Sequence, residues 1–125
     1  MSFLDRDRII GLSDSRVERV EVPEWGGHVY VRSLSVAELD RFRADGERRK
    51  ATAGPHDATV RLVVLAACDE RGAPLFRPED AQALRDKSVA AVERVGAAAL
   101  RLNTVTEAAA DAAEKNSDAT PSPGS

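Results

Sequence analysis

The chain has 125 residues, a net charge of −3 and a single cysteine, and 42% of its residues are hydrophobic. This length fits one domain, the slight negative charge argues against a nucleic-acid partner, and one cysteine excludes an intramolecular disulfide and fits a reducing compartment. No apolar run approaches the roughly 20 residues of a membrane span, and the charges from position 5 onward leave no apolar region for a signal peptide.

Residues 1–14 precede the first predicted strand and carry a weak helix signal. Asp5 lies where it could cap one or two helical turns. We expect Leu4, Ile9 and Ile10, the apolar residues of this segment, to dock on the core.

Residues 16–34 are predicted to form an antiparallel hairpin, the segment around which the rest of the chain is organised. Val20 and Val22 alternate with charged residues, which is the period of a strand. The Pro-Glu-Trp-Gly-Gly sequence at 23–27 predicts the turn, because proline cannot donate to the ladder and glycine adopts positive φ readily. Residues 28–34 form the second strand.

The hairpin is also where we place most candidate contact residues. Val29 and Val31 share one face of the second strand and Tyr30 lies on the other, while Trp25 stands at the turn. Trp25 either covers the helices or is an exposed anchor for a partner, and the sequence does not favour one over the other. Since a lone hairpin is marginal in water, it must lie on helices or pair with a strand of another chain.

Four helices are predicted after the hairpin, over about 36–50, 56–70, 78–86 and 89–103. The first opens with a capping box, in which the Ser35 hydroxyl and the Glu38 carboxylate each accept a backbone N–H. Val36, Leu39 and Phe42 form a narrow apolar stripe on it, and we add Leu39 and Phe42 to the candidate contacts. The fold class is therefore α+β, with a hairpin followed by a mainly helical body.

The run at 62–68 is apolar almost all round, which is typical of a buried helix. A strand is the competing interpretation, given the three valines. We favour a helix, because Ala66 and Ala67 continue the run and Asp57 can cap its start. After the last helix, residues 104–125 carry the net negative charge, and they are Ala-rich at first and of disordered composition from 116 onward.

No residue pattern predicts a catalytic, metal or cofactor site. His28, His56 and Cys68 are isolated from one another, whereas a structural zinc site uses four ligands in closely spaced pairs. Cys68 lies in an apolar run next to acidic residues, which is unsuitable for a reactive thiolate. The basic residues of 36–50 alternate with acidic ones, as on a solvated face. We therefore expect no enzyme, no cofactor and no nucleic acid or membrane partner.

Four segments in this order resemble the tail assembly chaperone family of long-tailed, double-stranded DNA bacteriophages and prophages. They are the Pro-Glu-Trp-Gly-Gly hairpin of 20–34, the Ser-x-x-Glu-Leu-Asp-Arg-Phe helix start, the Asp-Glu-Arg-Gly-x-Pro-Leu-Phe segment of 69–76, and Leu-Arg-Leu-Asn at 100–103. The resemblance covers about residues 3–103, which we take as a single domain. Its motifs are moderately specific together and not diagnostic singly.

The resemblance implies a non-enzymatic role in the host cytoplasm. Such proteins bind the tape measure protein, keep it soluble while the tail tube protein polymerises around it, and are absent from the virion. Many are made in two lengths by a ribosomal frameshift, and the longer form carries an extension, which would diverge here from Thr104, thought to recruit tube protein. We also expect self-association into a homo-oligomer.

Two other functions compete with the chaperone. The first is a small structural tail protein, of the completion or connector type, that stays in the particle. The second is a DNA-binding regulator that uses the helix at 36–50, for which we expect no salt-dependent binding to duplex DNA.

Overall fold

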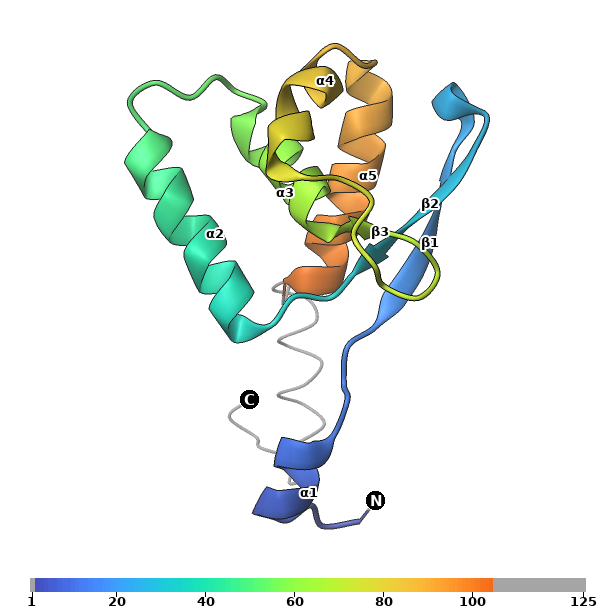
Figure 1. The fold of residues 1–125 in the computed structure, drawn as a ribbon, viewed down its shortest axis with the longest axis vertical. Coiled ribbons are helices and arrows are strands. Elements are labelled where there is room, and N and C mark those ends of the chain that lie inside the picture. Colours follow the sequence, from blue (N-terminus) through green and yellow to red (C-terminus); the bar gives the residue numbers. More distant parts are fainter. Residues whose placement is uncertain (1, 105–125) are drawn as a thin grey trace, which may run out of the picture.

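The computed structural model describes residues 2–104, and the predictions for the tail beyond Thr104 lie outside this range. The elements follow one another as α1 (Arg6–Gly11), β1 (Val17–Val22), a 3₁₀ turn (Pro23–Trp25), β2 (Gly27–Arg32), α2 (Val36–Arg49), α3 (Asp57–Ala66), β3 (Ala67–Cys68), a second 3₁₀ turn (Pro78–Asp80), α4 (Ala81–Arg85) and α5 (Val89–Asn103). The predicted α+β class with an N-terminal hairpin is confirmed (Figure 1).

The sheet has the strand order β1-β2-β3 and both pairings are antiparallel. In the hairpin, Val17 pairs with Arg32 and Val22 with Gly27. Gly26 takes up the left-handed conformation at the turn, with φ of 74°, where a side chain would be strained. Pro23 and Gly26 therefore close the hairpin as the sequence predicts, whereas the prediction of positive φ at Gly27 is wrong, because Gly27 already belongs to β2.

The predicted C-terminal end of the helix over 56–70 is wrong. It stops at Ala66, and the next two residues form β3, which adds to β2 through the pairs Tyr30–Cys68 and Val31–Ala67. Both β3 residues are fully buried, so the ladder satisfies backbone groups that a helix would otherwise have to satisfy. The strand alternative holds only for these two residues, because pairing with β2 overrides the local helix preference.

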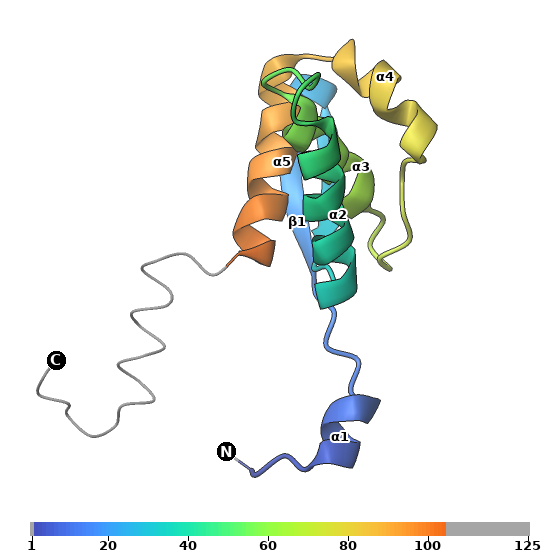
Figure 2. The ribbon, with the colours of Figure 1, turned by 90° about the vertical axis from the view of Figure 1, so that its left-hand side faces the viewer.

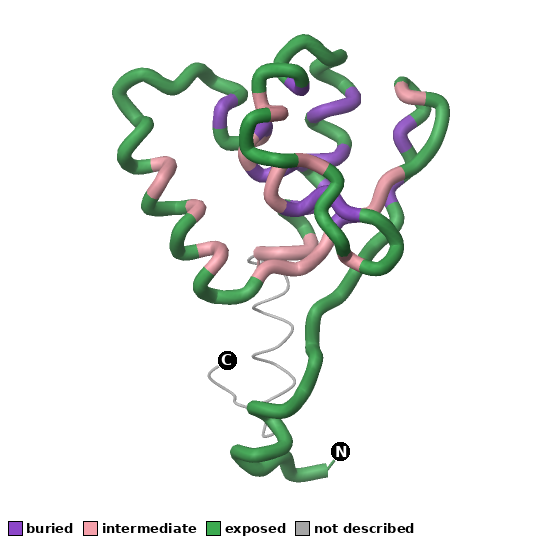
Figure 3. Tube along the Cα trace, viewed as in Figure 1, coloured by how far each residue is buried: buried purple, intermediate pink, exposed green. Residues whose placement is uncertain are grey.

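The core lies between α3, α5 and one face of the sheet (Figure 3). Its largest fully buried side chains are those of Val22, Val31, Val63, Val95 and Cys68. The close approach of α3 to α5 depends on Gly96, where an added Cβ would lie 2.6 Å from the methyl carbon of Thr59. This core is built from valine, leucine and alanine, whose small size requires the helices to pack closely.

Two polar contacts attach the hairpin to α5. Arg94 donates to the carboxylate of Glu24 at 2.8 and 3.1 Å, next to the turn. At the other end, the Asn103 side chain accepts from the Leu34 N–H at 2.6 Å and donates to the Arg32 carbonyl at 3.2 Å. The hairpin therefore lies along a helix, as its marginal stability alone requires.

The prediction that the N-terminal segment docks on the core is wrong. Asp5 does cap α1, accepting from the Arg8 N–H at 2.9 Å, but α1 buries none of its residues. Ile9 is 52% exposed and Ile10 71%, and Figures 1 and 2 show α1 lying away from the body, beyond the start of β1. A six-residue helix has too little apolar surface to offset the ordering of the loop that would bring it back.

Candidate interaction surface

Helix α2 lies at the side of the body and contacts the core through Phe42. None of its residues is buried, and Val36, the first of its apolar stripe, is 79% exposed. Figure 1 shows α2 on one side of α3 and α5 on the other. Because a free-standing helix of 14 residues is marginal in water, α2 depends on its contacts with the body, which it makes near both ends and at Phe42.

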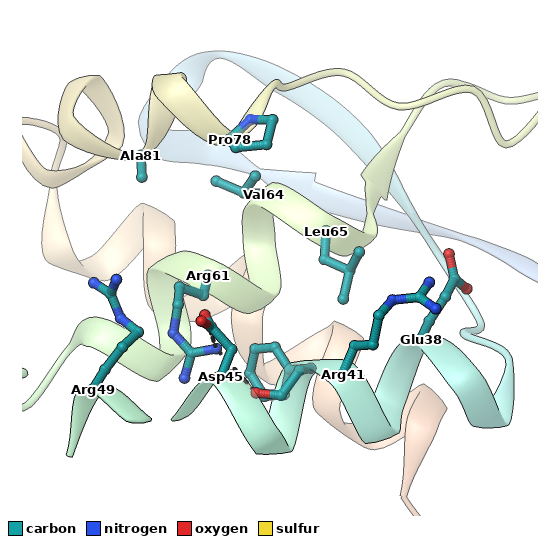
Figure 4. Close-up of a pocket in the computed structure, with 10 residues that line it drawn as sticks. Glu38, Arg41, Asp45, Arg49, Arg61, Val64, Leu65, Pro78 and Ala81 are labelled. Carbon is teal, nitrogen blue, oxygen red and sulfur yellow. Dashed lines mark hydrogen bonds and ion pairs between the residues drawn. The ribbon is translucent and has the colours of Figure 1, made fainter. Parts of the chain in front are cut away.

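A groove of about 350 Å³, the α2 groove, runs between α2 on one side and α3 and α4 on the other (Figure 4). Its lining combines apolar and charged side chains, and the charged side chain of Arg61, which is only 14% exposed, lies against the Phe42 ring. The apolar lining residues are Phe42, Val64, Leu65, Pro78 and Ala81, and the charged ones are Glu38, Arg41, Asp45, Arg49 and Arg61.

Phe42 also borders a second apolar groove, on the side of α2 that faces α5. This groove measures about 320 Å³ and includes Leu62 and Leu100, of which Leu100 is 54% exposed. Arg61 fixes the Phe42 ring, since its guanidinium lies 4.4 Å from the ring centroid and donates to the Phe42 carbonyl at 3.2 Å. One clamped aromatic side chain thus separates two apolar grooves.

Asp57 joins α2 to the body through three arginines. Its carboxylate accepts from Arg49 of α2 at 2.6 and 3.0 Å, from Arg61 at 2.9 Å and from Arg85 of α4 at 2.9 Å. Asp57 is only 2% exposed. The hydrogen bond from Arg49 is the main cause that holds the Asp57 pKa far below its ordinary range, although burial acts in the opposite direction.

The prediction that Asp57 caps α3 is wrong. His56 occupies the N-cap without a side-chain hydrogen bond, and Asp57 is the first residue of the helix. Its carboxylate hydrogen-bonds to arginines instead. The i, i+4 spacing of Asp57 and Arg61 on an otherwise apolar helix is the one signal in the sequence that could have indicated this cluster.

The start of α2 is attached by a second ion pair. Arg32 donates to Glu38 at 2.9 and 3.0 Å, and Glu38 completes the predicted capping box with Ser35, which is confirmed. The hydrogen bonds from Arg32 and then the Ser35 N–H lower the Glu38 pKa from its ordinary value near 4.5 to about 2.

These two carboxylates predict an acid-sensitive fold. Both pKa values are lower in the folded than in the unfolded chain, so the unfolded chain binds more protons as the pH falls below about 4.5. We expect the free energy of unfolding from urea titrations to be constant from neutral pH down to that point and to decrease toward pH 2. Glu38→Gln should flatten part of this decrease, and an unchanged slope would contradict the role given to Glu38.

The four predicted contact residues of the hairpin differ in how deeply they are buried. Val31 is fully buried, so its prediction as a surface contact is wrong, because its face of the sheet is covered by α5. Trp25 and Val29 are partly buried and pack against the core, which gives Trp25 a covering role. Tyr30 lies on the opposite face, with its ring 5.5 Å from that of His28.

The other two predicted contacts, Leu39 and Phe42, lie half-buried on α2. Of these, Phe42 reaches the α2 groove. The sequence thus identifies the helix that borders the groove but not the opposite wall, which comes from α3 and α4.

The described residues hold no grouping of three or more His, Cys, Asp or Glu side chains suited to a metal ion. The Cys68 thiol is fully buried, and this burial raises its pKa. A raised pKa disfavours the thiolate, so Cys68 is unsuited to a nucleophilic role. Across residues 2–104 no helix is long and apolar enough to span a membrane.

Comparison with known proteins identifies the family. The family model described as phage tail assembly chaperone matches residues 11–116. The chain belongs to the phage tail assembly chaperone family. The resemblance that the hairpin and the helix starts carry is therefore confirmed, and it extends over most of the chain.

A solved structure shares the fold of this phage tail assembly chaperone family member. The tail assembly chaperone of bacteriophage HK97 is similar with a TM-score of 0.57 and 23% sequence identity, over 81% of this chain and 95% of that one. No curated protein matches the chain. The family and the shared fold support a chaperone role in tail assembly, which is a non-enzymatic role.

Proposed function

We propose that this chaperone binds the tape measure protein of its phage in the host cytoplasm and keeps it soluble, helps to recruit the tail tube protein, and is not retained in the virion. The family supplies the general role, and the α2 groove supplies a surface for the client. Recruitment of tube protein is proposed to use an extension beyond the body, of the kind that a frameshift provides.

The single observation that carries client binding is the composition of the α2 groove. An amphipathic helix places apolar side chains in a hydrophobic groove and keeps its polar residues at the rim. Here apolar side chains line the groove together with charged ones of both signs, including Arg41, for which no ion pair is found among the described residues. Of the predicted contacts, Phe42 is the one we retain as a client contact.

Ala81→Glu tests this proposal, and circular dichroism must first show that the variant is folded, because Ala81 also packs against the core. Ala81 is half-buried and lines the groove at the start of α4, where a carboxylate favours the helix but would enter the groove. When the protein is co-expressed with the tape measure protein, we expect the variant to co-purify about tenfold less client, because a charge must be buried against the apolar side chains.

The matched control is Ala83→Glu, the same change on the same helix at an exposed position that does not line the groove. It should co-purify as much client as the wild type. Equal recovery with both variants would exclude the α2 groove as the binding surface, and absence of the client from the wild-type preparation would contradict client binding itself.

A retained structural tail protein is the alternative function. Mass spectrometry of purified virions distinguishes the two functions. If the protein is a chaperone that is not retained, we expect no abundant peptides from this chain. Stoichiometric recovery of peptides from 16–103 in mature particles would favour the structural protein.

A further inference from the structure

The charged side chains of α2 that border the α2 groove lie on one face of the helix. Glu38, Arg41, Asp45 and Arg49 recur at intervals of three or four residues, and all four line the groove together with Phe42. Figure 4 shows Glu38, Arg41 and Asp45 projecting from α2 toward α3. Along this face the charges therefore alternate in sign, from the negative Glu38 to the positive Arg49.

Three of these four charges have ion-pair partners within the chain, and Arg41 is the exception. The pairs are Glu38–Arg32 at 2.9 Å, Asp45–Arg48 at 3.3 Å, Asp45–Arg61 at 3.5 Å and Arg49–Asp57 at 2.6 Å. Arg41 is exposed and has no ion pair among the residues that the structure describes. Glu38, one turn before it, already accepts from Arg32 with both carboxylate oxygens.

The opposite side of the groove does not supply the missing negative charge. The described residues that line this side are Arg61, Val64, Leu65, Pro78 and Ala81, and none of them is acidic. The charge beyond them is positive as well, because Arg49, Arg61 and Arg85 share the single carboxylate of Asp57. The groove therefore combines an apolar surface with a positive charge that is not compensated.

A client segment that fills the groove covers Arg41 and removes part of its hydration. A guanidinium group that is covered without an acceptor is costly, whereas one that meets a carboxylate forms charge-assisted hydrogen bonds. The groove therefore discriminates between apolar segments in two ways. It rejects those that bring a cation to Arg41 and favours those that bring a carboxylate.

The alternation of charge along α2 favours an isolated carboxylate over a continuous polyanion. Glu38 and Asp45 lie one turn before and one turn after Arg41. A nucleic-acid backbone along this face would meet both of them and be repelled. A peptide helix, in contrast, can place one acidic residue at Arg41 and neutral or basic residues one turn away.

We infer, on the basis of the proposed function, that the α2 groove selects its client segment by charge. The segment is an amphipathic helix that carries an aspartate or glutamate beside its apolar face, and Arg41 is the residue that pairs with this carboxylate. The apolar side chains of the groove supply the contact area, and Arg41 determines which apolar segments are accepted.

Overlapping synthetic peptides that cover the tape measure protein of the same phage provide the probe. We expect the wild type to retain apolar peptides that contain Asp or Glu, and Arg41→Glu to bind them at least about tenfold more weakly in fluorescence anisotropy. The acidic residues of the best-binding peptide are then replaced by lysine, one at a time. One replacement should weaken binding to the wild type and restore binding to Arg41→Glu, because it regenerates the pair with exchanged signs.

Arg43→Glu is the matched control on the same helix. Like the change at position 41, it places a glutamate three residues after one acidic residue and four before another, here Asp40 and Glu47. Position 43 is exposed and does not line the groove. The control should bind the peptides as the wild type does, and circular dichroism checks that both variants are folded.

The possible contrary results separate this inference from the proposed function. Equal binding by both variants, or a lysine series that restores nothing, overturns the charge selection. Displacement of the peptides by duplex DNA from the wild type but not from Arg41→Glu would assign Arg41 to nucleic acid instead. If Ala81→Glu abolishes peptide binding and Arg41→Glu does not, the groove remains the client site and only the selection is wrong. A wild type that binds neither the peptides nor the intact tape measure protein overturns both.

Discussion

Replacing Asp57 with alanine should lower the free energy of unfolding by about 3 to 5 kcal/mol, because removing one partner of a buried ion pair leaves the other charge uncompensated. Arg61 is the arginine most affected, since its side chain is 14% exposed, whereas Arg49 and Arg85 can turn partly toward water. The loss should therefore fall near the lower end of this range. Urea unfolding followed by circular dichroism measures it.

The same substitution should release the C-terminal end of α2. Arg49 of α2 is attached to the body through Asp57, so amide hydrogen exchange in α2 should accelerate more than in α5, where the core residues lie. Asp40→Ala is the matched control, an exposed aspartate of α2 with no ion pair among the described residues, and should change stability by less than about 0.5 kcal/mol. Equal losses for both variants would show that the buried cluster is not what holds α2.

The sequence predicts those parts of this fold whose causes are local. The hairpin turn follows from Pro23 and Gly26, and the start of α2 from the Ser35–Glu38 capping box, all of which act over a few residues. The family resemblance rests on these same local features. Where neighbouring side chains determine the local backbone conformation, that conformation can be predicted without knowing which elements pack against it.

The features that the sequence did not predict depend on residues far apart in the chain. Strand β3 exists because β2 offers a free edge at Tyr30 and Val31, and the Asp57 cluster collects arginines from α2, α3 and α4. The charges of 36–50 resemble a solvated face, yet Arg49 contacts a buried carboxylate. The sequence also did not predict that Ala81 lines the α2 groove, since only the packing of α4 against α3 brings this residue opposite α2.

Gly96→Ala should destabilise the protein by about 2 kcal/mol, although alanine is the better helix former. The new Cβ would lie 2.6 Å from the Thr59 methyl carbon, and 3.7 Å from a methyl carbon of Val63. Overpacking of this kind costs about 1 to 3 kcal/mol, against a propensity gain of at most about 1 kcal/mol. Thr59 is stiff at χ1, because its side chain branches at Cβ, so the contact is relieved chiefly by separating α3 from α5.

Removing the obstructing methyl group distinguishes this steric effect from any other role of the glycine. In Thr59→Ser the hydroxyl remains and the methyl carbon at 2.6 Å is absent, so the double variant G96A/T59S should be more stable than the sum of the two single changes implies. We expect a favourable coupling of at least about 1 kcal/mol from the four thermal or urea unfolding curves. Additive losses would mean that Gly96 is required by the backbone of α5 itself, and that helices α3 and α5 have more space between them than the contact with Thr59 implies.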